Sequence, residues 1–364
     1  MVAFDLIPER VKNLPAYVPG RLTEDVAEAM GLSQVIKLAS NENCLGPSPL
    51  AVQAMAEALT GLGRYGDADS RRLREAIAKS LNVEPERILA GNGSSEFLVL
   101  MTLALLEPGL SAIMSRPSFT LYASTVMATG ARAIQVPVTS DFGHDLKAIA
   151  AKVDPSVRLI FLDNPLNPTG AWLTREDLKA FHDQMPNSCL LVLDEAYVDF
   201  SRRPKPDYAA LLAAGRTVIL RTFSKNYGLA GARAAYLVGP PDLVKNLNKI
   251  RQPFNLNLLA QVGALAALSD HEHLKKSQEA TWAGLAYLHE NLASLGLSTH
   301  PTEANFLMVG PIAMGADELE RALLKKGLII RSLSSFGLPS HARISTGLPQ
   351  ENAALIAALS QILA

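Results

Sequence analysis

The chain has 364 residues, of which 48% are hydrophobic and 19% are charged, and its formal net charge is −1. This composition is typical of a globular protein with a large core, and the near-neutral charge gives no reason to expect nucleic acid or an anionic membrane as a partner. Cys44 and Cys189 are too few and too far apart for a disulfide framework or a zinc site, so no metal is expected. The chain has neither a signal-peptide pattern nor the ~18-residue apolar run of a membrane span. We therefore expect a cytoplasmic protein.

Short apolar runs alternate with segments of helical periodicity from about residue 51 onward. The runs lie at residues 88–90, 112–114, 133–136, 159–162, 190–193, 218–220 and 234–238. Gly, Pro, Asp or Asn bounds them, which is typical of strands buried on both faces. Helices between such strands predict an α/β fold with a mostly parallel central sheet covered by helices.

A long helical pattern over residues 271–295 leads into shorter strands and helices that continue to the C-terminus. We expect a large domain at residues 36–270 and a smaller α/β domain built from residues 1–35 and 271–364. Ligands of open α/β sheets bind beyond the carboxyl ends of the strands. The polar residues that directly follow each apolar run are therefore the candidates for a functional site.

Lys225 follows the run at 218–220 and is flanked by Thr222 and Ser224, with Arg233 eight positions further on. A lysine alone is most often a solvated surface charge. Here the small residues between Lys225 and Arg233 allow close backbone approach to a ligand. An amine, two hydroxyls and a guanidinium suit a cofactor that carries both an aldehyde and a phosphate.

Two further strand ends add polar groups. Asp194 follows the run at 190–193, and it is either a helix cap or ion-pair partner, or the carboxylate that holds the proton of a pyridine nitrogen. Tyr197 either packs in the core or reaches the phenolic oxygen of the same cofactor. The sequence NPLNPTG, residues 164–170, is at least a rigid turn, and it could also hold the Asn167 amide as a donor to that oxygen.

A glycine-rich turn, GNGSSE at residues 91–96, lies between the run at 88–90 and an apolar helix. Backbone N–H groups and the helix dipole make such a turn an anion site. In a plainer interpretation, Ser94 or Ser95 only caps the helix. The pattern fits neither a dinucleotide-binding fingerprint nor a Walker loop.

These four segments, in this order, resemble the class I/II aminotransferases of pyridoxal-5′-phosphate (PLP) fold type I. More narrowly, the chain is similar to the histidinol-phosphate aminotransferase family over essentially its whole length. The segments that carry this similarity are residues 17–20, 38–43, 45–49, 64–65, 222–233 and 343–345. The resemblance implies a PLP enzyme with a large domain and a smaller α/β domain.

The resemblance also implies roles for single residues. Lys225 would be the Schiff-base lysine and proton shuttle, and Asp194 would hold the pyridinium proton. Asn167 and Tyr197 would bond the phenolic oxygen, and Tyr122 would stack on the pyridine ring. The residues implied at the cofactor phosphate are Gly93, Ser94, Ser95, Thr222, Ser224 and Arg233.

Other implied residues concern the partner subunit and the substrate. Tyr65 would reach the cofactor phosphate of a second subunit, which implies a homodimer with shared active sites. Arg343 would grip the acidic group of the substrate with Arg331 as its helper, and Tyr17 and Asn43 would also contact the substrate. The sequence departs from the family pattern at Cys44, Gly66, Leu166, Asn226 and Ala235, none of which removes a chemical group that PLP chemistry needs.

The expected reaction is transamination between histidinol phosphate and 2-oxoglutarate, in histidine biosynthesis. An aromatic amino-acid aminotransferase and a threonine-phosphate decarboxylase on the same scaffold are the alternatives, and the intact stretch from Arg343 to Gly347 favours an aminotransferase. A PLP-binding regulator is disfavoured, because such proteins carry a DNA-binding region for which there is no room before Tyr17.

Overall fold

A computed structural model describes residues 6–16 and 20–364, and a seven-stranded sheet forms its centre. Along the sheet the strands follow the order β2-β8-β7-β6-β5-β3-β4. Their bounds are β2 (Ile88–Gly91), β3 (Ser111–Arg116), β4 (Arg132–Pro137), β5 (Val157–Asp163), β6 (Leu190–Asp194), β7 (Thr217–Thr222) and β8 (Ala235–Val238). Each of the seven apolar runs predicted as a strand is one of these strands. Strands β3 to β7 run parallel, and β8 is antiparallel to both of its neighbours.

Alternate residues of the strands contribute to separate hydrophobic clusters, because neighbouring side chains of a strand point to opposite faces. One cluster joins Phe161 of β5 to helices α5 (Ser94–Leu105), α6 (Leu121–Ala128) and α10 (Pro241–Ile250). Another joins Ile160 to α7 (Leu146–Ala150), α8 (Arg175–Gln184) and α9 (Tyr208–Ala213). A third cluster lies under α3 (Pro49–Ala58), α4 (Arg71–Leu81) and α11 (Leu258–Ala267). Helices therefore cover both faces of the sheet, as the sequence predicted.

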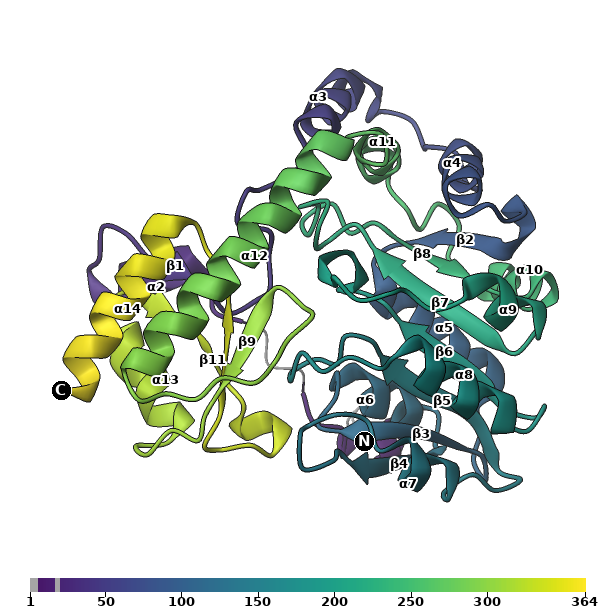
Figure 1. Cartoon of the computed structure of the whole chain (residues 1–364). Helices are drawn as coiled ribbons and strands as arrows, with labels where there is room; N and C mark the ends of the chain where they lie inside the picture. Colours follow the sequence, from purple (N-terminus) through teal and green to yellow (C-terminus); the bar gives the residue numbers. More distant parts are fainter. Residues whose placement is uncertain (1–5, 17–19) are drawn as a thin grey trace.

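The part of the chain from about residue 285 onward has a hydrophobic core of its own, separate from those of the central sheet. Helix α12 (His271–Ser294), which was predicted at residues 271–295, runs from beside α3 and α11 toward this part (Figure 1). The antiparallel strands β11 (Arg331–Ser332), β12 (Ala342–Ser345) and β9 (Phe306–Val309) form its sheet, beside α13 (Ala316–Leu324) and α14 (Pro349–Leu363).

The N-terminal segment contacts both parts of the molecule. Helix α1 (Glu9–Lys12) packs on α6, where Arg10 Nε donates to the Ala128 carbonyl oxygen at 3.1 Å. Helix α2 (Thr23–Met30) packs through Val26 on Leu324 and Ile329 of the C-terminal part, and β1 (Ile36–Lys37) pairs in parallel with β10 (Leu328–Ile329). The division into domains at residues 35 and 270 stays a prediction.

The parallel strands bring their carboxyl ends to one edge of the central sheet. Asp163, the last residue of β5, is the register partner of Asp194, the last residue of β6, and β7 ends beside them at Thr222. Among the described residues, no helix is long and apolar enough to cross a membrane, and no group of three or more His, Cys, Asp or Glu side chains could hold a metal ion.

Candidate active site

Lys225 lies three residues beyond β7, and it lines a cavity of about 260 Å³. Its Nζ donates to the Ser40 carbonyl oxygen at 3.2 Å and lies 5.4 Å from the centre of the Tyr197 ring. Asp194, from the neighbouring strand end, lines the same cavity. The order of the strands, rather than proximity in sequence, brings this amine and this carboxylate together.

The Asp194 carboxylate is buried, with 5% of the residue exposed. Burial raises its pKa to about 6, although hydrogen bonds from the Tyr122 hydroxyl and the Ala196 N–H lower that pKa. The Tyr122 hydroxyl donates to Oδ2 at 2.9 Å, and the Ala196 N–H donates to Oδ1 at 3.1 Å. A buried carboxylate without an ion pair is costly. The site therefore favours a ligand that brings a positively charged N–H to Asp194.

The lining of the cavity is also rich in hydrogen-bond donors. It includes Ser94 and Ser95, at the start of α5, together with Thr222, Ser224 and Arg233. The Thr222 hydroxyl donates to Ser224 Oγ at 2.9 Å, and Arg233 Nη1 lies 3.4 Å from the same oxygen. A helix N-terminus, hydroxyls and a guanidinium form a binding site suited to a phosphate.

Gly93 permits this arrangement. Its φ is +81°, and a Cβ added there would lie 2.3 Å from Arg233 Nη2. Any other residue at this position would displace the guanidinium. The glycine-rich turn predicted as an anion site therefore packs directly against the predicted phosphate-binding arginine.

Asn167 and Arg343 are 176 positions apart in sequence and in direct contact, because Arg343 Nη1 donates to Asn167 Oδ1 at 2.5 Å. Arg343 Nη2 also donates to the Ala39 carbonyl oxygen at 2.7 Å. With the amide oxygen bound to Arg343, the amide NH₂ is the group that Asn167 can offer to a ligand. The residue predicted to donate to the cofactor and the arginine predicted to bind the substrate are therefore hydrogen-bonded to each other.

Two predicted aromatic residues also reach the cavity. The Tyr197 hydroxyl accepts from Asn41 Nδ2 at 3.0 Å, and its ring packs edge-on against Phe306. Tyr122 is fully buried, and its ring stacks on Phe161 with the centroids 4.9 Å apart. Tyr122 thus supports the carboxylate of Asp194 through its hydroxyl, which the sequence did not indicate. Its stacking on a cofactor ring stays a prediction.

A second cavity, of about 140 Å³, adjoins the first, since Lys225, Asn167 and Tyr197 line both. Arg331 and Arg343 line this second cavity. Asn43 lines neither of the two, because its Nδ2 bonds the Asn226 carbonyl oxygen at 2.8 Å and Ser277 Oγ at 2.7 Å.

Two other predicted residues are not brought to these cavities. Tyr65 is 82% exposed, stacks on Phe254 with the centroids 4.4 Å apart, and lines neither cavity. Tyr17 lies outside the described residues. The substrate contacts of Tyr17 and Asn43 stay predictions.

The sequence analysis missed Asp163, a second buried carboxyl group in the larger cavity. Its Oδ2 accepts from the Asn167 N–H at 2.8 Å, so it holds the turn that carries Asn167. Burial, together with the charge of Asp194, raises its pKa well above the ordinary value. Asp163 directly follows the apolar run at 159–162, so the same strand-end criterion that selected Asp194 could have found it.

Comparison with known proteins places this geometry in a family. The family described as Aminotransferase class I and II matches residues 33–359. Histidinol-phosphate aminotransferase of Moorella thermoacetica is 45% identical over 98% of this chain and 92% of its own length. Histidinol-phosphate aminotransferase 2 of Ralstonia nicotianae is 44% identical over 98% of this chain and 97% of its own length.

A solved structure agrees with the sequence relatives. The crystal structure of histidinol-phosphate aminotransferase from Sinorhizobium meliloti in complex with pyridoxal-5′-phosphate superimposes with a TM-score of 0.92 at 30% identity, over 99% of this chain and 98% of that one. The predicted α/β fold is thereby confirmed. The chain belongs to the class I and II aminotransferase family, and its relatives within that family include histidinol-phosphate aminotransferases.

Proposed function

We propose that this protein is a PLP-dependent aminotransferase that transfers the amino group of histidinol phosphate to 2-oxoglutarate. One observation carries the proposal: a single cavity combines the Lys225 amine, the buried Asp194 carboxylate and a cluster of phosphate-binding donors. Relatives named histidinol-phosphate aminotransferase, 44–45% identical over nearly the whole chain, support the choice of substrate.

The donor set fits PLP group by group. Arg233, Ser94, Ser95, Thr222 and Ser224 would hold the phosphate, Lys225 Nζ the aldehyde carbon and Asp194 the ring nitrogen. Gly93 leaves the room that the Arg233 guanidinium occupies beside the helix N-terminus. The raised pKa of Asp194, about 6, is what a carboxylate awaiting a cationic partner should have. When bound, PLP serves as an electron sink for the bond broken at the substrate Cα.

The residues of the chain would then divide the remaining work. Lys225 Nζ takes the proton from the substrate Cα, as a general base whose position is fixed beside Tyr197. Asp194, oriented by the Tyr122 hydroxyl, would keep a proton on the ring nitrogen. The Asn167 NH₂ and the Tyr197 hydroxyl would donate to the phenolic oxygen. Arg343 would bind the acidic group of the substrate. Its hydrogen bond to Asn167 would link substrate binding to the position of the Asn167 amide.

The substrate side of the site is positively charged. Lys225, Arg331 and Arg343 line the smaller cavity. A cavity of about 390 Å³ that shares Arg331 and Phe336 with it adds Arg116. Among the residues described as lining these two cavities, none carries a carboxylate. Such a lining favours substrates with a phosphate or a distal carboxylate, as histidinol phosphate and 2-oxoglutarate have.

We also propose a homodimer with shared active sites. The exposed Tyr65 ring stacks on Phe254, which is itself partly exposed, and Leu59 and Leu62, a few positions earlier in the chain, are also exposed. Exposed apolar surface of this kind is typical of a protein–protein interface. The resemblance to the family assigns Tyr65 to the cofactor phosphate of the second subunit. A cytoplasmic location is the corresponding proposal for the cell, and both cysteines are free thiols, in keeping with a reducing compartment.

Truncation of Arg343 tests the proposed substrates. In Arg343→Ala, kcat/KM should fall by about two orders of magnitude for both histidinol phosphate and 2-oxoglutarate, because a charge-assisted pair is lost in each half-reaction. Arg343→Lys should recover only part, because a point charge cannot replace the planar fork. Single-turnover kinetics with histidinol phosphate, phenylalanine and 2-oxoglutarate measure this, and Arg132→Ala, at an exposed arginine elsewhere, is the control.

Two outcomes would contradict the proposal. If phenylalanine is a better donor than histidinol phosphate for the wild-type enzyme, the protein is an aromatic amino-acid aminotransferase. If the wild-type enzyme releases CO₂ from threonine phosphate faster than it transaminates histidinol phosphate, it is a decarboxylase.

A further inference from the structure

The glycine-rich turn at the phosphate end of the cavity is held from outside by a chain of hydrogen bonds. Glu96, in the first turn of α5, accepts the Asn92 N–H at Oε2, at 2.6 Å. A Cβ on Gly91 would lie 2.6 Å from this same oxygen, so the carboxylate fills the space beside the turn. The position of Glu96 therefore fixes the path of the backbone from Gly91 to Gly93.

Asn255 holds Glu96 in place. It lies in the segment between α10 and α11, about 160 residues away in sequence, and its Nδ2 donates to the two Glu96 oxygens at 3.0 and 2.8 Å. The same NH₂ lies 3.3 Å from the Ala90 carbonyl oxygen, at the end of β2. One amide thus joins the strand, the turn and the first turn of the helix.

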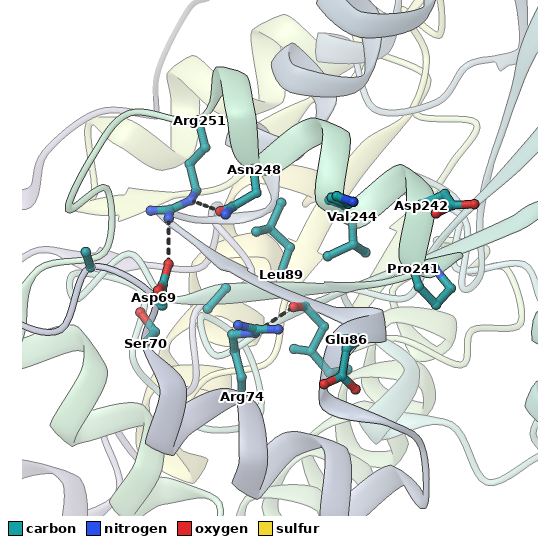
Figure 2. Close-up of a pocket in the computed structure, with 14 residues that line it drawn as sticks. Asp69, Ser70, Arg74, Glu86, Leu89, Pro241, Asp242, Val244, Asn248 and Arg251 are labelled. Atoms are coloured by element: carbon teal, nitrogen blue, oxygen red, sulfur yellow. Dashed lines mark hydrogen bonds and ion pairs between the residues drawn. The ribbon is translucent and has the colours of Figure 1, made fainter.

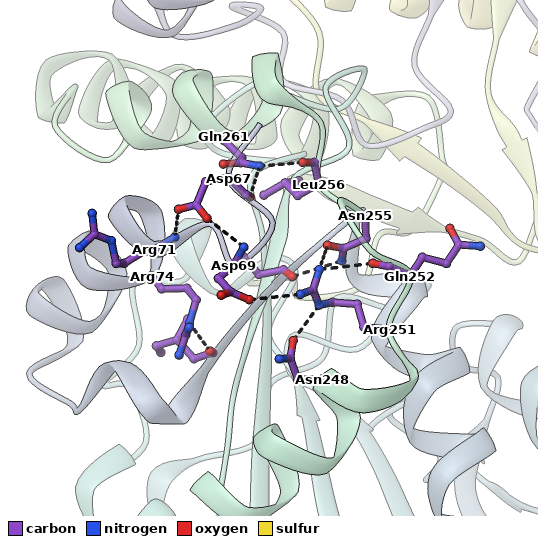
Figure 3. A network of polar contacts seen from close by, with 12 residues as sticks. Asp67, Asp69, Arg71, Arg74, Asn248, Arg251, Gln252, Asn255, Leu256 and Gln261 are labelled. Carbon is purple, nitrogen blue, oxygen red and sulfur yellow. Dashed lines mark hydrogen bonds and ion pairs between the residues drawn. The ribbon is translucent and has the colours of Figure 1, made fainter. Parts of the chain in front are cut away.

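Arg251 fixes the orientation of that amide. Its Nη1 donates to Asn255 Oδ1 at 2.6 Å, which leaves the NH₂ side of Asn255 for Glu96 (Figure 3). The Arg251 side chain is only 8% exposed, and its Nε donates to Asn248 at 2.9 Å. Figure 2 shows Arg251 at the wall of a cavity of about 260 Å³, between Asn248 and Asp69. A guanidinium held on several sides is a rigid anchor for Asn255.

The segment from Arg251 to Asn255 also contacts Tyr65, because the Tyr65 ring stacks on that of Phe254. In addition, Arg251 Nη2 lies 3.6 Å from Asp69 Oδ1. Asp69 is 66% exposed at its side chain, so this ion pair contributes little stability by itself. The stretch from Arg251 to Asn255 nevertheless contacts two features of the site. One is the glycine-rich turn, and the other is Tyr65, which is proposed to reach the cofactor phosphate of the other subunit.

We propose that Asn255, oriented by Arg251, is a positioning residue for the cofactor phosphate: it anchors Glu96 so that the N–H groups at the start of α5 are set for the anion before it binds. This inference rests on the proposed PLP function. A preset turn loses no conformational freedom on binding, so its contribution is confined to the phosphate. The rest of the cofactor should not depend on Asn255.

The test compares PLP with pyridoxal, which has the same ring and aldehyde but no phosphate. Each is titrated spectroscopically into full-length protein freed of cofactor, as wild type, Asn255→Ala and Arg251→Lys. In metal sites, mutation of a residue that hydrogen-bonds to a ligating side chain typically changes affinity by ~10–100-fold. We expect the Kd of PLP to rise by about that factor in Asn255→Ala and by less in Arg251→Lys, and the Kd of pyridoxal to change less than about twofold. Asn246→Ala, an exposed amide on α10, is the matched control.

An equal loss of PLP and pyridoxal, or no loss of either, would overturn the inference, since the first is general disruption and the second no role at all. If Asn255→Ala does not fold, Asn255→Asp replaces it. The new carboxylate faces the Glu96 carboxylate, and repulsion between like charges should displace Glu96, so the Kd of PLP should rise while that of pyridoxal stays nearly unchanged. Failure of the proposed function is detected separately, by borohydride reduction of the wild-type holoenzyme and peptide mapping, which should label Lys225.

Discussion

Asp194 combines two requirements that conflict until a ligand arrives. Its carboxylate must be buried to hold a proton on a ring nitrogen, yet burial without a cation raises its pKa to about 6 from an ordinary value near 4. Between these two pH values the folded protein binds more protons at this group than the unfolded chain does. The stability of the cofactor-free protein should therefore fall as pH rises through this window, and the loss should be complete above about pH 6.

Asp194→Asn removes this pH dependence, because an amide does not ionise. The free energy of unfolding of the cofactor-free variant, relative to wild type, should rise by on the order of 3 kcal/mol between pH 4 and pH 8. Urea denaturation at several pH values measures the difference. Asp141→Asn is the control: hydrogen bonding from Thr139 lowers the pKa of that exposed carboxyl, so its trend should have the opposite sign. A relative stability of Asp194→Asn that is constant with pH would contradict the burial argument.

At the scale of elements, the segment after β7 is shaped by close backbone packing. Gly228 has a φ of +71°, and a Cβ added there would lie 2.0 Å from the Gly46 carbonyl oxygen. This contact joins the segment that carries Lys225 to the N-terminal segment that supplies Ser40, the residue whose carbonyl oxygen accepts from Lys225 Nζ. Only glycine fits a positive φ and a backbone neighbour at that distance.

Gly228→Ala should therefore lower the free energy of unfolding by roughly 2 kcal/mol or more, from strain and from displacement of the Gly46 backbone. Gly231→Ala is a matched control in the same segment, because a Cβ there meets no atom of the described residues within 4 Å. It should leave stability within about 0.5 kcal/mol of wild type. Equal stability of the two variants in urea denaturation would show that the contact with Gly46 is not restrictive.

The elements also show what the sequence could and could not predict. All seven central strands followed from apolar runs, because a strand buried on both faces leaves a continuous apolar signal. The antiparallel placement of β8 between β7 and β2 leaves no such signal, since the direction of pairing is decided by tertiary contacts. In the site, the polar residues at strand ends could be identified from the sequence. The hydrogen bonds from Arg343 to Asn167 and from Tyr122 to Asp194 could not be predicted, because they join residues far apart in the chain.

At the scale of the whole molecule, Tyr65 is the residue by which an active site shared in a dimer would differ from one built by a single chain. Tyr65 is 82% exposed, and among the described residues its ring stacks on Phe254 alone, so it gains little from its position in a single chain. A partner subunit would bury it, and in a symmetric dimer each subunit would supply Tyr65 to the other. A protein that stays monomeric and active at high dilution would contradict the dimer proposal.

Mixed dimers test this arrangement directly. Lys225→Ala and Tyr65→Ala should each be strongly impaired in amino-group transfer, the first through lost chemistry and the second through weakened phosphate binding. In a mixed dimer, one site would combine an intact Lys225 with an intact Tyr65 from the other subunit, whereas the second site would lack both. Random association makes half of the dimers mixed, so co-expression should restore about a quarter of wild-type activity.

The control for these mixtures pairs Lys225→Ala with Asp194→Ala. Both residues line the cavity of the same chain, so exchange of subunits cannot bring an intact pair together and activity should not return. Activity is measured at saturating histidinol phosphate and 2-oxoglutarate, with PLP held near the wild-type Kd so that loss of the phosphate contact remains visible. If the first mixture recovers no more activity than the control, Tyr65 does not act across the interface, and its exposed ring needs another explanation.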